Sequence, residues 1–396
     1  MKLAERMTRL TAETDLEVLP RALALERLGK EIIHFETADP DFLTPPSAFE
    51  ARVAGTKSGP VKHSASRGQL ELRTRLAHVA GNSRGARFLP EQVVLMPGAK
   101  AILFYTILAL IDEGDEVLYP NPGYPAYESI IAFAGGKPVP YPLREGNDFQ
   151  LDLGFFADHL TRRTRLLILN SPSNPTGAVE SLAGLRELVE LIGSRDVWVI
   201  SDETYSSFVY KRDHASISCF DAMSEKTIVI DAFSKAFSKT GLGYGIMPRD
   251  LVAQLSKLIK DFICYTPAIS ERAGLAALEA REATIQQTMQ EYRRRRDMMV
   301  HRLSRIPGVR CQSPGGGFYV FPNVSAFGKS SMEIADCLLE QAGVACLAGS
   351  EFGARGEGFL RLSFATSMEK IREGLDRIAA TLANIRTTEV AASHHN

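Results

Sequence analysis

The chain has 396 residues, of which 45% are hydrophobic, and its 46 Lys and Arg residues face 47 Asp and Glu residues, for a formal net charge of -1. This length is enough for two domains, or for one large domain with an appendage, around a sizeable core. The balanced charge argues against nucleic acid or an anionic membrane as a partner, so we expect small molecules instead.

The N-terminal residues, the apolar runs and the cysteines indicate where in the cell the protein is expected. The first residues, MKLAERMTRL, are charged and lack the apolar block of a signal peptide, and the longest apolar run, 101–111, is too short to span a bilayer. The five cysteines are scattered and form no CxxC motif, which fits reduced thiols better than a disulfide framework. We therefore expect a cytoplasmic protein without a membrane span.

Short β-rich runs alternate with helical patterns between residues 90 and 235. Strands are expected at 92–96, 115–120, 165–170, 197–202 and 226–233, and helices between them at 101–112, 126–134 and 181–193. This alternation predicts an α/β fold with a mostly parallel sheet flanked by helices. Ligands of such sheets bind at the carboxyl ends of the strands.

The expected strand ends carry residues suited to binding. Gly98, Ala99 and Lys100 follow the first strand and open a helix, where unpaired backbone N–H groups can cradle a phosphate. The later strands are followed by Tyr124, by Asn174, by Asp202 with Tyr205, and by Ser234 with Lys235. Each residue alone has an ordinary explanation as a cap or surface side chain, but together, in this order, they point to one site.

The sequence resembles the fold-type I enzymes that use pyridoxal 5′-phosphate, in the class I and II aminotransferase group related to aspartate aminotransferase. The similarity is colinear over nearly the whole chain, through LGKEIIHFETADPDFLTPP (28–46), SPSNPTG (171–177), SDETY (201–205) and FLRLSFA (359–365). Its strongest part is the set Asn174, Asp202, Tyr205, Lys235 and Arg361, in family order and near family spacing.

This resemblance implies an architecture. A large domain at 48–290 would carry the sheet and the cofactor, and a smaller α+β domain would combine 1–47 with 291–396. A helix over EYRRRRDMMVHRL (291–303) would link them, with its arginines on a solvated or intersubunit face. The segment PGGGFYVFP (314–322) would be a strand edge near the active site. A homodimer with active sites at the interface is expected.

The resemblance also implies catalytic roles. Lys235 would form the Schiff base with pyridoxal 5′-phosphate and later move protons, while Lys239, in the second Ser-Lys pair, would take no part in this covalent chemistry. Asp202 would pair with the protonated pyridine nitrogen, and Asn174 and Tyr205 would hydrogen-bond the ring oxygen. No metal is expected.

Further positions complete the implied site. Tyr124 would stack on the cofactor ring, and Arg361 would grip the substrate α-carboxylate through its planar guanidinium, with Asn174 beside it. Ala38 replaces a family glycine and would narrow the substrate side by one methyl group. Gly98, Ala99, Lys100 and Ser234 would surround the phosphate.

Three phosphate-side positions depart from the family pattern. The arginine expected eight residues after Lys235 is Gly243, the small hydroxyl residue expected three before it is Ala232, and a tyrosine that reaches the neighbouring subunit's phosphate is His63. Ser234, Lys239, Lys100 and His63 are open candidates for the lost contacts. The departures fit drift in a tolerant loop, or chemistry other than amino transfer, since some carbon–sulfur lyases of this fold also lack the arginine.

The segment 11–22 matches the part of relatives that packs over the substrate side chain, and it contains Glu13, Asp15 and Glu17. Carboxylates before a helix ordinarily serve as caps. The alternative is that one of them faces a cationic substrate side chain.

The first function expected is an aminotransferase acting on an amino acid and a 2-oxo acid. A lyase, cyclase or oxidase that uses the same cofactor is the alternative, because Lys235, Asp202 and Arg361 serve both. The third option is a binding or regulatory module on this fold, which predicts a protein without the absorbance band of the cofactor.

Overall fold

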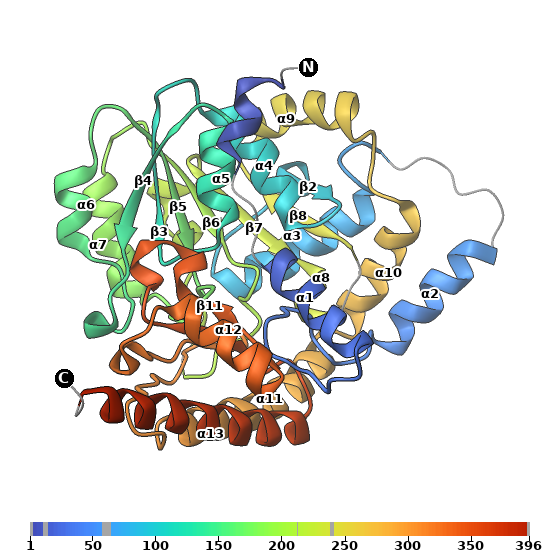
Figure 1. Cartoon of the computed structure of the whole chain (residues 1–396). Helices are drawn as coiled ribbons and strands as arrows, with labels where there is room; N and C mark the ends of the chain where they lie inside the picture. Colours follow the sequence, from blue (N-terminus) through green and yellow to red (C-terminus); the bar gives the residue numbers. More distant parts are fainter. Residues whose placement is uncertain (1–2, 11–14, 58–64, 212, 238–240, 394–396) are drawn as a thin grey trace.

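The computed structural model describes residues 3–10, 15–57, 65–211, 213–237 and 241–393. Figure 1 shows a central sheet with helices on both sides and the C-terminal helices gathered below it. The helices are α1 (Asp15–Arg27), α2 (Pro46–Lys57), α3 (Leu70–Arg84), α4 (Ala99–Leu110), α5 (Ala126–Phe133), α6 (Leu153–His159), α7 (Leu182–Ile192), α8 (Phe233–Ala236), α9 (Arg249–Phe262), α10 (Ala268–Glu279), α11 (Arg281–Leu303), α12 (Ser331–Ala342) and α13 (Met368–Ser393).

Within these residues, the large sheet contains seven strands in the order β2-β8-β7-β6-β5-β3-β4. Its members are β2 (Val93–Met96), β3 (Glu116–Asn121), β4 (Lys137–Pro142), β5 (Thr164–Asn170), β6 (Trp198–Asp202), β7 (Thr227–Ala232) and β8 (Gly243–Ile246). The pairs formed by β3, β4, β5, β6 and β7 are parallel, whereas β8 runs antiparallel to both of its neighbours, β2 and β7. The predicted α/β fold with a mostly parallel sheet is confirmed.

Alternate residues of the central strands pack on opposite faces of the sheet. Ile168 and Ile200 join the cluster that includes side chains of α4, α5 and α9, and Leu167 and Val199 join the cluster with α6 and α7. Because both faces are covered, these strands are continuous apolar runs rather than alternating ones. Their polar residues therefore come at the strand ends.

Two strands of the large sheet were not anticipated from the sequence. β4 contains Pro138, Pro140 and Pro142, which disfavour a strand, but it lies at the sheet edge and pairs only with β3. β8 reads GYGI, and its glycines likewise weaken the strand signal. In both cases the tertiary position in the sheet outweighs the local propensity.

The remaining strands form two small sheets. β1 (Ile33–His34) pairs in parallel with β10 (Val344–Ala345), and β11 (Leu347–Ala348), β12 (Leu360–Ser363) and β9 (Tyr319–Val320) form an antiparallel sheet in that order. β9 lies at the edge of this sheet, where the segment 314–322 was expected to contribute a strand edge. The β1–β10 pair joins the N-terminal segment to the C-terminal part of the chain. The proposed domain boundaries at 48 and 290 stay a prediction.

The arginine run on α11 is placed differently from the expectation. Arg295 is buried and pairs with Asp41 at 2.7 Å, and Arg296 is buried with its guanidinium 4.4 Å from the Tyr210 ring centroid. The expectation of a solvated or intersubunit face is therefore wrong for these two side chains. Their long stems pack in the interior while their charged ends find partners within the chain.

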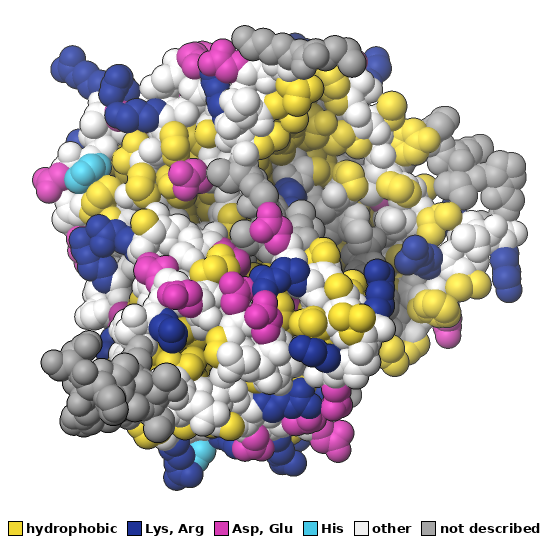
Figure 2. Space-filling view, in the orientation of Figure 1, with side chains coloured by type: hydrophobic (Ala, Val, Ile, Leu, Met, Phe, Trp, Pro, Cys, Tyr) yellow, Lys and Arg dark blue, Asp and Glu magenta, His cyan; other side chains and the backbone are white. Residues whose placement is uncertain are grey.

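Among the described residues, no helix combines the length and apolarity that crossing a membrane requires. In Figure 2, basic and acidic side chains are intermixed over the lower half of the face shown.

Candidate active site

A cavity of about 310 Å³ lies where the central strands end. Its lining comes from the segments that follow β1, β2, β3, β5, β6 and β7 and from β12. Every residue predicted for the site lines this cavity: Ala38, Gly98, Ala99, Lys100, Tyr124, Asn174, Asp202, Tyr205, Ser234, Lys235 and Arg361. The structure thus brings together side chains separated by more than three hundred positions in sequence, from Ala38 to Arg361.

Lys235 reaches into the cavity from the short helix α8, directly after β7. Its Nζ donates a hydrogen bond to the backbone carbonyl of Ala38 at 2.8 Å, and it lies 6.0 Å from the Phe318 ring centroid. The residue is partly buried, so its amine is held within the site rather than in bulk water. The other lysine of the two Ser-Lys pairs, Lys239, lies outside the described residues.

Asp202 ends β6 and is buried, with 9% of its surface exposed. Its carboxylate accepts hydrogen bonds from neutral hydroxyls, at 2.7 Å from Tyr127 and at 2.6 Å from Thr204. Burial raises the pKa of Asp202 above its ordinary value, while the hydrogen bonds from Thr204 and Tyr127 act in the opposite direction. A carboxylate in this state is stabilised by a cation placed in the cavity.

Arg361 lies on β12 and is buried, with 3% of its surface exposed. Its guanidinium donates to the Asn174 side-chain oxygen at 3.2 Å and to the backbone carbonyl of Glu36, both neutral acceptors. Its Nε is buried without a hydrogen-bond partner among the described residues. A buried guanidinium that meets only neutral acceptors favours an anionic ligand.

Two tyrosines next to this guanidinium form a hydroxyl pair. The hydroxyls of Tyr205 and Tyr319 lie 2.7 Å apart, and the Arg361 guanidinium lies 4.5 Å from the Tyr319 ring centroid. Tyr319 was not singled out in the sequence, although it belongs to the segment 314–322. Tyr127 and Thr204, which hold Asp202, were also missed, and only their spacing from Tyr124 and Asp202 offered a signal.

The start of α4 forms another wall of the cavity. Gly98 precedes this helix with φ of 93°, a left-handed conformation that favours glycine, and the helix begins at Ala99. The Lys100 ammonium lies 5.8 Å from the Tyr124 ring centroid. Unpaired N–H groups at the start of a helix make this wall suited to an anion.

Gly243 lies directly against this wall. A Cβ at position 243 would come 2.4 Å from the Gly98 carbonyl carbon and 2.5 Å from the Ala99 nitrogen. The arginine of the family pattern therefore does not fit here while the backbone of 98–99 stays in place. Ala232, the second departure, lines the cavity, and His63, the third, lies outside the described residues.

The acidic N-terminal residues can be placed only in part. Glu13 lies outside the described residues, and Asp15 is the first residue of α1, while the Glu17 side chain is exposed. The hypothesis that one of these carboxylates faces a cationic substrate stays untested.

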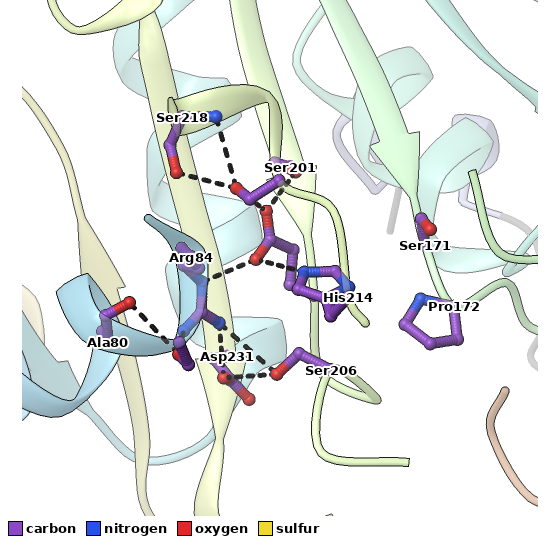
Figure 3. Close-up of polar contacts among 12 residues, drawn as sticks. Ala80, Arg84, Ser171, Pro172, Ser201, Ser206, His214, Ser218 and Asp231 are labelled. Carbon is purple, nitrogen blue, oxygen red and sulfur yellow. Dashed lines mark hydrogen bonds and ion pairs between the residues drawn. The ribbon is translucent and has the colours of Figure 1, made fainter. Parts of the chain in front are cut away.

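A buried ionic cluster joins α3 to β7 and to Glu203, the residue that follows β6 (Figure 3). Arg84 pairs with Glu203 at 2.6 Å and with Asp231 at 2.7 Å, and His214 lies 2.8 Å from Glu203. Glu203 follows Asp202 in sequence, and Asp231 stands on the strand that leads to Lys235. The cluster therefore ties together the two strands that deliver the central acid and the central amine. No sequence signal identified it.

Comparison with known proteins agrees with this arrangement. The model of the family "Aminotransferase class I and II" matches residues 30–378. A probable aspartate/prephenate aminotransferase of Aquifex aeolicus is 36% identical over 392 residues, covering 97% of this chain and 99% of that protein. An arginine–pyruvate transaminase of Pseudomonas aeruginosa is 35% identical over 367 residues, covering 92% of this chain and 93% of that protein.

Solved structures give the same result. Aspartate aminotransferase from Thermus thermophilus with maleate has a TM-score of 0.92 and 32% identity, covering 96% of this chain and 100% of that one. A structure of aspartate aminotransferase from Rhizobium meliloti has a TM-score of 0.92 and 31% identity, covering 97% and 99%. Because these similarities extend over nearly the full length of both partners, this chain belongs to the class I and II aminotransferases.

Proposed function

We propose that this aminotransferase binds pyridoxal 5′-phosphate in the described cavity, with Lys235 as the covalent attachment point, and transfers an amino group between an amino acid and a 2-oxo acid. The observation that carries the proposal is the pair of buried charges on the cavity wall. Asp202 and Arg361 both line the cavity and both make hydrogen bonds to neutral groups. Asp202 therefore suits a cationic group of a ligand, and Arg361 suits an anionic group.

The residues present fit this cofactor. The pyridine nitrogen of pyridoxal phosphate becomes a cation when protonated, which suits the buried Asp202 carboxylate. Its phosphate suits the start of α4, which begins at Ala99, because the first backbone N–H groups of a helix have no acceptor within the helix. The Gly98 N–H is already used, since it donates to the Met96 carbonyl at 2.8 Å. The aldehyde requires a primary amine, and Lys235 Nζ is the amine held in the cavity by Ala38. The Tyr124 ring and the Tyr205 hydroxyl lie on the same lining.

When bound, the cofactor supplies an electron-withdrawing ring that stabilises negative charge at the substrate α-carbon. Asp202 would keep the ring nitrogen protonated and so maintain that withdrawal. The free Lys235 amine would accept the proton from the substrate α-carbon as a general base. Arg361 binds the substrate α-carboxylate and orients the α-carbon, and Asn174 fixes Arg361 through their 3.2 Å hydrogen bond.

The described residues say less about the substrate side chain than about the α-carboxylate. By their names, one relative acts on aspartate or prephenate and another on arginine with pyruvate, so the family frame accommodates both acidic and cationic partners. We propose an amino acid and a 2-oxo acid as substrates. A cationic amino acid is one candidate, through Glu13 or Asp15. Replacing each by its amide should then raise KM selectively for basic substrates.

Borohydride reduction of the reconstituted protein, followed by peptide mass spectrometry, tests the attachment point. We expect the phosphopyridoxyl group on the peptide that contains Lys235. Lys235→Ala should lose the label and the activity, whereas the matched control Lys239→Ala should keep both. A label on Lys239, or no label in the wild-type protein, would refute the assignment.

A product assay separates amino transfer from the lyase, cyclase and oxidase alternatives. Without an added 2-oxo acid, a transaminase forms one equivalent of product 2-oxo acid per active site and stops, and adding an acceptor restarts it. An eliminating enzyme instead releases ammonia over many turnovers. We expect the first pattern, and sustained ammonia release would refute it.

A further inference from the structure

The Tyr205–Tyr319 hydroxyl pair joins the two halves of the proposed active site. Tyr205 follows β6 in the large sheet, lines the cavity, and is proposed to hydrogen-bond the cofactor ring oxygen. Tyr319 belongs to β9 of the small sheet and is completely buried. Their hydroxyl oxygens are 2.7 Å apart, which is hydrogen-bond distance. One of the two hydroxyls therefore donates its proton to the oxygen of the other.

The same Tyr319 side chain also supports the carboxylate-binding arginine. β9 and β12 are antiparallel, with Ser363 opposite Tyr319, so Arg361 is the diagonal neighbour of Tyr319 on the same face of the sheet. The Arg361 guanidinium lies 4.5 Å from the Tyr319 ring centroid. Since both residues are buried, this cation–π contact is desolvated and correspondingly strong.

Burial keeps the Tyr205 hydroxyl protonated and therefore a donor. Burial raises the pKa of Tyr205 well above its ordinary value, Tyr319 raises it further, and the charge of Arg361 opposes them. Asp202, which also faces this hydroxyl, raises the pKa as well. A hydroxyl that stays protonated can donate only one hydrogen bond, so the direction of the Tyr205–Tyr319 bond decides where that proton points.

We infer that Tyr319 is a positioning residue: its hydroxyl donates to the Tyr205 oxygen and so directs the Tyr205 proton into the cavity, while its ring face holds the Arg361 guanidinium. This inference rests on the proposed function. A hydroxyl that accepts a hydrogen bond becomes a better donor itself. Tyr319 thereby strengthens the bond from Tyr205 to the cofactor ring oxygen and, through its ring, supports the group that binds the substrate carboxylate.

The two contributions can be separated by two substitutions. Tyr319→Phe removes the hydroxyl and keeps the ring beneath Arg361, and Tyr319→Leu removes both. The first readout is the pH midpoint of the cofactor's visible absorbance in the holoenzyme without substrate. A hydrogen bond to the ring oxygen favours its anionic form and lowers that midpoint, so weakening the bond should raise it. The second readout is KM for the amino acid.

For Tyr319→Phe we expect the midpoint to rise by roughly half a pH unit to one unit, with KM unchanged. Tyr205→Phe should raise it at least as much. For Tyr319→Leu we expect the same rise together with a KM increase of roughly two- to tenfold, from the lost contact with Arg361.

Tyr292→Phe is the matched control. Tyr292 belongs to the same aromatic cluster, with its ring centroid 5.6 Å from that of Phe318. Its hydroxyl is buried and has no hydrogen-bond partner among the described residues. Its loss should leave the midpoint and KM as in the wild type.

A midpoint that stays at the wild-type value in Tyr319→Phe but moves in Tyr205→Phe would overturn the inference and leave the proposed function standing. A midpoint that moves equally in Tyr292→Phe would also overturn it, because the effect would then be a general response of the core. If the reconstituted wild-type protein has no visible absorbance band, the proposed function itself fails.

Discussion

Glu203 is a buried acid whose ionisation links stability to pH. Burial acts to raise the pKa of Glu203, but the charge of Arg84 and hydrogen bonds from His214 and Ser216 outweigh it and hold the pKa at about 2. Removing either partner of a buried ion pair leaves an uncompensated charge, which costs more than the pair contributes. The cluster thus links Asp231, on the strand that leads to Lys235, with Glu203, which directly follows Asp202.

This depressed pKa gives a pH prediction. A carboxylate with a lowered folded-state pKa stabilises the protein above its unfolded value of 4.5, and this contribution is lost as the pH falls from there towards about 2. Urea unfolding across this window should show a loss of stability in the wild type. Glu203→Gln should be less stable at neutral pH and show a smaller loss over the same range. Parallel curves for the two proteins would contradict the prediction.

Two elements of the fold meet at Gly243. β8 pairs antiparallel with β2, with Gly243 opposite Met96, and this register brings Gly243 against the backbone that leads from β2 into α4. Backbone atoms of Gly98 and Ala99 occupy the space that the Cβ of the family arginine would need. The absence of the arginine is therefore matched by close packing of β8 against the start of α4, and it does not by itself favour a lyase.

Gly243→Ala should accordingly displace the start of α4, because its Cβ has no room. We expect a lower melting temperature and a pyridoxal phosphate Kd raised by roughly tenfold or more, the effect of about 1.4 kcal/mol in binding free energy. Fluorescence titration with the cofactor measures the second effect. Gly146→Ala, at an exposed site with nothing within 4 Å of the new Cβ, is the control and should leave both unchanged. Tighter cofactor binding in Gly243→Arg would contradict this explanation.

At the scale of the whole molecule, apolar side chains remain exposed at and before α2. Leu43 is 91% exposed and Phe49 is 61% exposed. Figure 2 shows hydrophobic side chains at the right-hand edge, where Figure 1 places α2 and α10. Two exposed apolar side chains so close in sequence are candidates for an interface. Because the family resemblance implies a homodimer, we expect them to lie between two copies of this chain.

Light scattering after size-exclusion chromatography should therefore give twice the chain mass of 43.5 kDa. Combining Leu43→Asp with Phe49→Glu should yield monomers and reduce activity, because charged groups would have to be buried at the interface. Leu182→Glu, on α7 at the opposite side in Figure 1, should remain a dimer. A wild-type protein of 43.5 kDa would refute the prediction.

The sequence by itself determined the fold class and the chemical groups of the proposed site. Apolar runs alternating with helical patterns predict a covered parallel sheet, and polar residues after those runs must converge at one sheet edge. That pattern, together with the family resemblance, is why Asn174, Asp202 and Lys235 could be selected before any geometry was known. Tyr127 and Tyr319 could not be selected in the same way, because nothing local distinguishes them from other tyrosines.

Only the tertiary structure decided which groups act on one another. Arg84, Glu203 and Asp231 are far apart in sequence, and nothing local distinguishes them from surface charges until α3, β6 and β7 are packed together. The same holds for the Tyr205–Tyr319 pair, which needs the small sheet to lie against the large one. The close approach of β8 to the start of α4 was likewise not predictable, because the glycines of β8 weaken the sequence signal for a strand. Contacts between distant segments are set by packing, which no local pattern encodes.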